Sequence, residues 1–135
     1  MHVRTGKVEY LELPVDVERS PGAPDRFVYG TARRTSTVNT RGIDPVAEDR
    51  SRTDGWQIPA FWGSPIAVGG TIYSTTTLGI TYALAAGAAV LDEHALLAVN
   101  DLGPSGNTWT LNTPSAADGR LYHRTLREVV CIGTR

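Results

Sequence analysis

The sequence predicts an all-β fold, and three observations support this prediction. Many short apolar runs are separated by turn-forming residues, since the 135 residues include 14 glycines and eight prolines. Residues 64–73 recur in modified form as residues 113–122, 49 positions further along the chain. The hydrophobic content of 41% and the charged content of 20% lie in the ordinary range of globular proteins. A chain of this length is expected to form one domain.

The N-terminal half contains two strand candidates and a long polar stretch. Residues 7–17 are interpreted as a strand with apolar side chains on both faces. Pro14 cannot donate to a ladder, so it marks an edge or a bend. Residues 26–30 form a short second strand candidate. Residues 33–60 are polar and carry charges of both signs, which predicts a surface loop or insertion.

The second half carries the internal repeat. Proline, alanine, glycine and tyrosine recur in register between residues 64–73 and residues 113–122. Each copy contains a Gly-Gly or Asp-Gly pair, which supplies the positive φ angles of a tight hairpin turn. A third strand is expected at residues 80–84 in the first copy and at residues 128–132 in the second. Residues 96–102 are expected to form the fourth strand of the first copy.

A repeat of about 40–50 residues with several strands per unit is typical of β-propeller blades. The sequence therefore predicts a partial propeller of about two to three consecutive four-stranded antiparallel blades. Residues 1–32 would form a degenerate or partial blade, residues 33–60 a polar surface loop, and residues 61–135 two C-terminal blades.

Residues 80–99 give a conflicting local signal. They are rich in alanine and leucine, and propensity alone would predict a helix of about 20 residues. Gly87 interrupts this segment, and the corresponding part of the second copy, residues 128–132, has a strand-like sequence. We therefore predict strands here.

Charge, cysteine content and hydrophobicity argue against several classes of protein. The net charge of −1 gives no indication of nucleic-acid binding. The single cysteine, Cys131, can form neither an internal disulfide nor a metal-thiolate pair, and it is predicted to be a buried strand residue. Residues 1–7 lack the apolar core of a signal peptide. The longest apolar stretch, residues 78–91, is too short to span a bilayer.

The candidate chemistry is sparse, and no metal or catalytic residues are predicted. His2, His94 and His123 have no metal-ligand spacing with one another or with Cys131. His123 is interpreted as a polar residue on a strand surface. The adjacent Asp92 and Glu93 would diverge on either a strand or a helix, which does not suit acid–base chemistry.

Three further groups are candidates for binding or catalysis. Asn100 and Asp101 are the best polar pair, and we expect them to hydrogen-bond the backbone of a turn at a strand end. Residues 103–106 lack the lysine of a phosphate loop, and Ser105 has no histidine or acid at motif spacing. The three tryptophans could stack on a sugar or a quinone, but packing between blades is the favoured interpretation. They are Trp56, Trp62 and Trp109.

The sequence resembles the C-terminal portion of pyrroloquinoline-quinone-like (PQQ-like) repeat proteins of bacteria. The resemblance is carried by Tyr82-Ala83-Leu84 with Gly87, and by the closing run Val130-Cys131-Ile132-Gly133. Ala85 and Leu91 stand where the family usually has aspartate and tryptophan. The resemblance implies a propeller and a periplasmic or exported location. Quinone-dependent members bind PQQ and calcium through residues on many blades, and none of these could be placed here, so the cofactor-binding residues are unassigned.

Two main functional hypotheses follow. The preferred one is a non-catalytic propeller segment that acts in binding or scaffolding within a larger PQQ-like repeat protein. The alternative is the terminal part of a quinoprotein alcohol or sugar dehydrogenase, in which case PQQ would be bound only by the full-length parent. A third hypothesis is a small β-domain that oligomerises. The expected partners are therefore the remaining blades of a longer chain, further copies of this chain, or other proteins.

Overall fold

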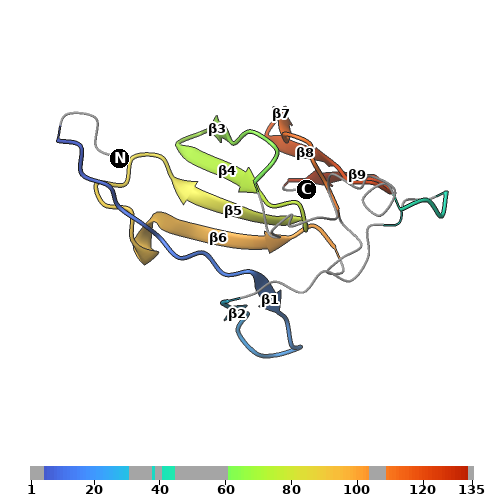
Figure 1. The fold of residues 1–135 in the computed structure, drawn as a ribbon, viewed down its shortest axis with the longest axis horizontal. Helices are drawn as coiled ribbons and strands as arrows, with labels where there is room; N and C mark the ends of the chain where they lie inside the picture. The colour runs from blue at the N-terminus through green and yellow to red at the C-terminus, as the bar shows by residue number, and fades with distance from the viewer. Residues whose placement is uncertain (1–4, 31–37, 39–40, 45–60, 104–108, 134–135) are drawn as a thin grey trace.

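A computed structural model describes residues 5–30, 38, 41–44, 61–103 and 109–133 (Figure 1). In these residues the chain forms three antiparallel sheets and one turn of 3-10 helix, so the predicted all-β class is confirmed. No helix of the described ranges is long and apolar enough to cross a membrane. Of the predicted loop 33–60, only residues 38 and 41–44 are described, and they lie outside any strand or helix.

The central sheet is a four-stranded meander in the order β3-β4-β5-β6. The segment with helical propensity forms strands, as predicted, with only a 3-10 turn at η1 (Glu93–Ala95) between the last two strands. Asp92 begins this turn by accepting a hydrogen bond from the His94 backbone N–H at 3.0 Å. The strands are β3 (Ile66–Val68), β4 (Thr71–Thr75), β5 (Ile80–Ala85) and β6 (Leu96–Asp101).

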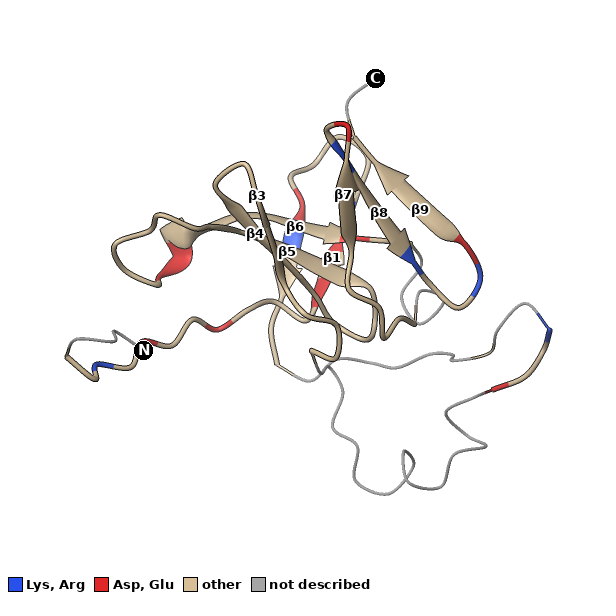
Figure 2. Ribbon diagram, turned by 90° about the horizontal axis from the view of Figure 1, so that it is seen from above, with Lys and Arg blue, Asp and Glu red and all other residues tan. Residues whose placement is uncertain are grey.

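The third sheet repeats the first part of the central sheet. It contains β7 (Ser115–Ala117), β8 (Arg120–Arg124) and β9 (Val129–Ile132), in that order. Its hairpin pairs Ser115 with Tyr122, and the central hairpin pairs Ile66 with Tyr73, so both partners are shifted by the same 49 positions. Seen from above, the third sheet stands beside the central sheet (Figure 2).

Both hairpins turn with two residues of positive φ. The central hairpin uses Gly69 and Gly70, with φ of 57° and 80°, and the third sheet uses Asp118 and Gly119, with φ of 49° and 71°. Such angles match the right-handed twist of the flanking strands. The repeat seen in the sequence therefore specifies the same turn twice.

The two copies differ by one residue after their second strand. The pairs Thr75–Thr81 and Arg124–Val129 are equivalent, so the offset falls from 49 to 48. A buried threonine closes both turns. Thr76 Oγ1 accepts a hydrogen bond from the Ile80 N–H at 3.3 Å, and Thr125 Oγ1 accepts one from the Glu128 N–H at 3.1 Å.

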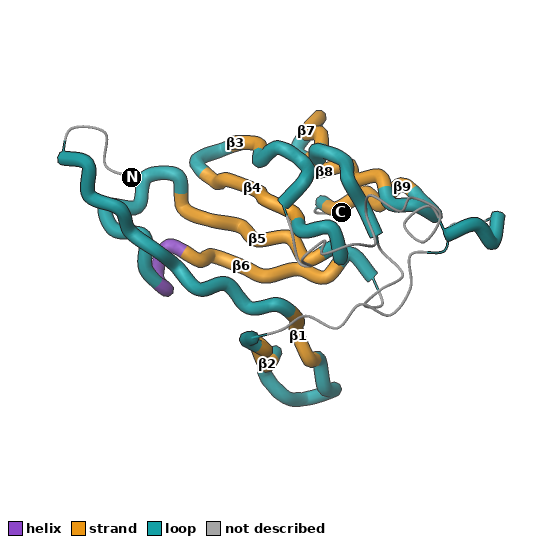
Figure 3. The backbone as a smooth tube through the Cα atoms, in the orientation of Figure 1, coloured by secondary structure: helices purple, strands orange, loops and turns teal. Residues whose placement is uncertain are grey.

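The N-terminal strand is much shorter than predicted. Residues 7–15 lie outside any strand, as the loop trace in Figure 3 shows, and pairing is confined to β1 (Asp16–Glu18) and β2 (Arg26–Val28). Pro14 explains the difference, because its buried carbonyl accepts a hydrogen bond from the Tyr82 hydroxyl instead of joining a ladder. The four-stranded unit is thus present in the central sheet, while the described residues supply three strands to the third sheet and two to the first.

Gly63 lies where the two copies of the repeat approach each other. A Cβ atom at Gly63 would come within 2.5 Å of the Asn112 carbonyl oxygen, and the next residue donates its N–H to Thr113 Oγ1 at 2.9 Å. We expect Gly63→Ala to lower the free energy of unfolding by about 1–3 kcal/mol, because the clash is with backbone. Urea denaturation would measure this, with Gly87→Ala as control, since a Cβ at Gly87 meets no atom within 4 Å. Equal effects of the two changes would contradict the close approach.

Candidate functional site

Trp109 joins the central sheet to the third sheet. It is 2% exposed and packs against Leu78 in the turn between β4 and β5, with Leu111 and Leu126 around it. The Trp109 carbonyl accepts a hydrogen bond from the Leu126 N–H at 3.0 Å, and the next residue, Thr110, donates its N–H to the Thr77 carbonyl at 2.9 Å. Trp109 therefore packs between sheets, as predicted.

Trp62 does not share this position. Trp62 is 48% exposed. Trp56 lies outside the described residues, so its predicted role stays a prediction.

His123 is buried, so its interpretation as a strand-surface residue was wrong. Its ring Nε2 lies 3.1 Å from Thr110 Oγ1. The Thr110 hydroxyl donates its single hydrogen to the Arg124 carbonyl at 2.7 Å, so it accepts from the ring and Nε2 carries the proton. Side chains alternate between the two faces of the sheet along β8, so His123 lies on one known face. The sequence alone does not show that the segment around Thr110 covers that face.

Burial lowers the pKa of His123 below its ordinary value of 6.5. The unfolded chain therefore binds a proton at a higher pH than the folded chain does. Stability is full above about pH 6.5 and falls as the pH drops from 6.5 toward the folded pKa. We expect urea denaturation at several pH values to show this loss, and His123→Gln to reduce it. His94→Gln is the control, because His94 is exposed; if it flattened the profile as much as His123→Gln, the assignment to His123 would be contradicted.

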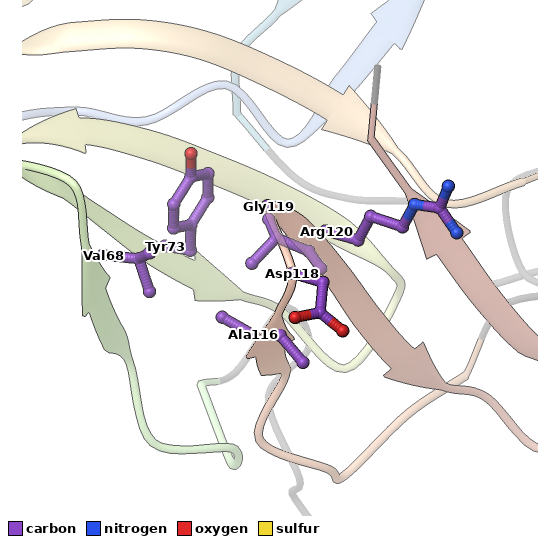
Figure 4. Close-up of a pocket in the computed structure, with 8 residues that line it drawn as sticks. Val68, Tyr73, Ala116, Asp118, Gly119 and Arg120 are labelled. Carbon is purple, nitrogen blue, oxygen red and sulfur yellow. The ribbon is translucent and has the colours of Figure 1, made fainter. Parts of the chain in front are cut away.

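A groove lies between the central sheet and the third sheet. It consists of two adjoining cavities of about 400 Å³ and 260 Å³, which share Tyr73, Gly119 and Leu121. Figure 4 shows the smaller cavity, with Val68 and Tyr73 of the central sheet across from Ala116 of the third sheet.

The groove combines apolar walls with a few polar groups, and the charged residues Asp118 and Arg120 line its smaller cavity. Its larger cavity is lined by alanine and leucine side chains together with Tyr73, Thr81 and Asn100. Such a surface suits a ligand with an apolar body and one or two hydrogen-bonding groups. Tyr73 and Thr81 were missed as site residues from the sequence, although Tyr73 belongs to the repeated motif and could have been singled out by comparison with Tyr122.

The two residues of the predicted polar pair, Asn100 and Asp101, have different roles. Asp101 Oδ1 accepts a hydrogen bond from the Gly103 N–H at 3.1 Å, so its predicted turn-bonding role is confirmed. Burial raises the pKa of the Asp101 carboxyl, and the negative charge of Asp16 on β1 acts in the same direction. Asn100, its neighbour on β6, lines the groove instead.

The other candidate residues are scattered. Asp92, Glu93 and His94 are exposed around η1 and do not line the groove, and Asp92 serves as the cap described above. Cys131 lies on β9 as expected, but it is exposed and not buried, because its face of the third sheet is not covered by the described residues. His2 and Ser105 lie outside those residues. Within the described ranges no group of three or more histidine, cysteine, aspartate or glutamate side chains could hold a metal ion.

Comparisons of the chain with protein-family models, with curated proteins and with solved structures found no match.

Proposed function

We propose that this chain is a propeller-repeat segment of the PQQ-like type whose function is binding or scaffolding, without catalysis. The observation that carries the proposal is that two copies of one repeat fold with the same hairpin register and stand next to each other, with a groove between them. Repeated sheets of this kind provide a surface for partners, and their function depends on what lines the grooves between them.

We expect two kinds of partner, one for the open sheets and one for the groove. The three-stranded and two-stranded sheets need further sheet surface, which the remaining blades of a longer chain or further copies of this chain would supply. The groove would bind a segment of a protein partner or a small molecule with an apolar body, because its polar groups are few and uncharged along β5 and β6.

The test is a binding screen with isotope-labelled protein, in which short apolar peptides and neutral aromatic compounds are added and amide shifts are followed. We expect shifts that cluster at Tyr73, Thr81 and Asn100, and we expect Tyr73→Ala to weaken binding by about tenfold. Tyr122→Ala is the matched control, because Tyr122 is the repeat equivalent of Tyr73 but does not line the groove.

Two results would count against the proposal. Equal losses from the two tyrosine changes would show that the groove is not the binding surface. Shifts at the groove on addition of PQQ with calcium, together with quinone-dependent oxidation of an alcohol or sugar, would favour the quinoprotein alternative.

A further inference from the structure

The third sheet has one face toward the groove and one face away from it. Side chains alternate along β8, so Arg120, Tyr122 and Arg124 lie opposite the face that carries Leu121 and His123. Arg120 also lines the smaller cavity of the groove, and in Figure 4 its side chain extends away from Val68 and Tyr73 on the opposite wall. We call the side directed away from the groove the outer face, and it consists of Arg120, Tyr122, Arg124, Val129 and Cys131.

The outer face of the third sheet corresponds, in the repeat, to the face of the central sheet that the third sheet covers. By the repeat offset, Tyr122 and Cys131 correspond to Tyr73 and Ala83, which line the groove against the third sheet. Val129, by contrast, is 66% exposed. The repeat therefore predicts that the outer face is covered by a further part of an assembly.

A surface of opposite charge lies on the other side of the central sheet, around η1. The segment before β1 and the turn at η1 enclose a hollow of about 450 Å³, which we call the acidic hollow. Figure 2 shows acidic positions at η1 on one side of the central sheet and basic positions on β8 on its other side. The residues of the hollow that concern us are Tyr10, Glu12, Tyr29, Asp92 and Glu93.

The chemistry of the two surfaces is complementary. Arg120 and Arg124 are exposed and, among the described residues, form no ion pair; the same holds for Glu12 and Glu93. A guanidinium group pairs with carboxylates through paired N–H groups and stacks on aromatic rings.

Tyrosine rings are available on both sides of the acidic hollow. Tyr10 is 87% exposed and Tyr29 is 51% exposed. The hollow thus offers both of the groups that an arginine side chain prefers.

We propose that the outer face of one copy docks into the acidic hollow of a second copy, so that copies of this chain associate head to tail. This inference rests on the proposed function, in which the third sheet is one repeat unit with a face that a further unit covers. The inference names a second copy of the chain as the source of that further unit. Such a contact joins two different surfaces, so it generates a closed ring or an extended array. Asp118 and Glu128 border the outer face, but three arginines, at 120, 124 and 127, outweigh them.

The test uses two charge-reversed variants, R120E/R124E and E12K/E93K, in the full chain. Asp92 is left unchanged because it caps η1. Each variant alone carries like charges on both surfaces and should repel itself. An equal mixture restores opposite charges at every junction, so the two variants should assemble with each other.

Light scattering coupled to size-exclusion chromatography at low ionic strength gives the readout. We expect wild-type mass above the 14.5 kDa of one chain, about tenfold weaker association for each variant, and recovery on mixing. The control E18R/R26E reverses an exposed ion pair on β1 and β2, away from both surfaces, and should behave as wild type. Circular dichroism verifies that all variants are folded.

Every outcome decides the inference. A wild-type chain that stays at single-chain mass overturns it, as do reversals without effect and a mixture that fails to assemble. These outcomes report on association between copies. The proposed binding function is judged separately by the Tyr73→Ala experiment, which is carried out with Arg120 unchanged.

Discussion

Trp109→Ala is expected to lower the free energy of unfolding by about 3–5 kcal/mol, the range for removing a buried aromatic side chain. Trp109 is 2% exposed, and its loss would leave a cavity against Leu78 and Leu126, where the two sheets meet. Urea denaturation followed by circular dichroism measures the change. The hydrogen bonds of Thr110 to Thr77 and of Leu126 to Trp109 should become less protected in hydrogen exchange.

The matched control is Trp62→Ala. Trp62 is 48% exposed, so its replacement should cost about 1 kcal/mol or less. If the two tryptophans contributed equally, Trp109 would not be the residue that docks the third sheet on the central sheet.

Tyr82→Ala is the second change with a large expected effect, again about 3–5 kcal/mol. Tyr82 is 1% exposed on β5 and packs with Val17, Ile80 and Val99, so it holds β1 against the central sheet. Its hydroxyl donates to the Pro14 carbonyl. Thermal or urea unfolding measures the loss, and amides of β1 should exchange faster than those of β8 in this variant.

Tyr82→Phe separates the hydrogen bond from the packing. It should cost about 1–2 kcal/mol, because it leaves the buried Pro14 carbonyl without a partner. Burial raises the pKa of Tyr82 from 10.0 to about 12, so stability is full below pH 10 and is lost as the pH rises toward 12. The Phe variant should lack this alkaline loss. An unchanged alkaline profile in Tyr82→Phe would contradict the assignment.

The repeat was the most informative feature of the sequence, because hairpin register follows from turn chemistry that short motifs encode. Gly69-Gly70 and Asp118-Gly119 specify two-residue turns, and these turns fix the pairing of the flanking strands. Residues 80–99 form strands despite their helical propensity because β5 pairs with β4 from Thr81 to Ala85 and with β6 on its other side.

Features that depend on contacts distant in sequence could not be predicted. Residues 7–15 have a strand-like pattern but form no strand. The Pro14 carbonyl instead accepts a hydrogen bond from the hydroxyl of Tyr82, which lies 68 positions further along the chain. His123 and Cys131 have opposite exposures to those expected, because the segment at Thr110 covers one face of the third sheet and leaves the other open. The groove arises where two sheets meet. The repeat supplies Val68, Tyr73 and residues 116–121 to its walls, but the repeat alone does not show that the two copies face each other across a groove.

The most direct test of the central claim is a solution NMR experiment that detects short proton–proton distances in the full chain. The claim is that the two copies of the repeat fold as equivalent hairpins whose sheets are docked through Trp109. We expect cross-strand contacts between Ala67 and Ile72 and, at the same register, between Ala116 and Leu121, together with contacts from the Trp109 ring to Leu78 and Leu126. A shifted register in either hairpin, or a Trp109 ring without contacts to both leucines, would contradict the account.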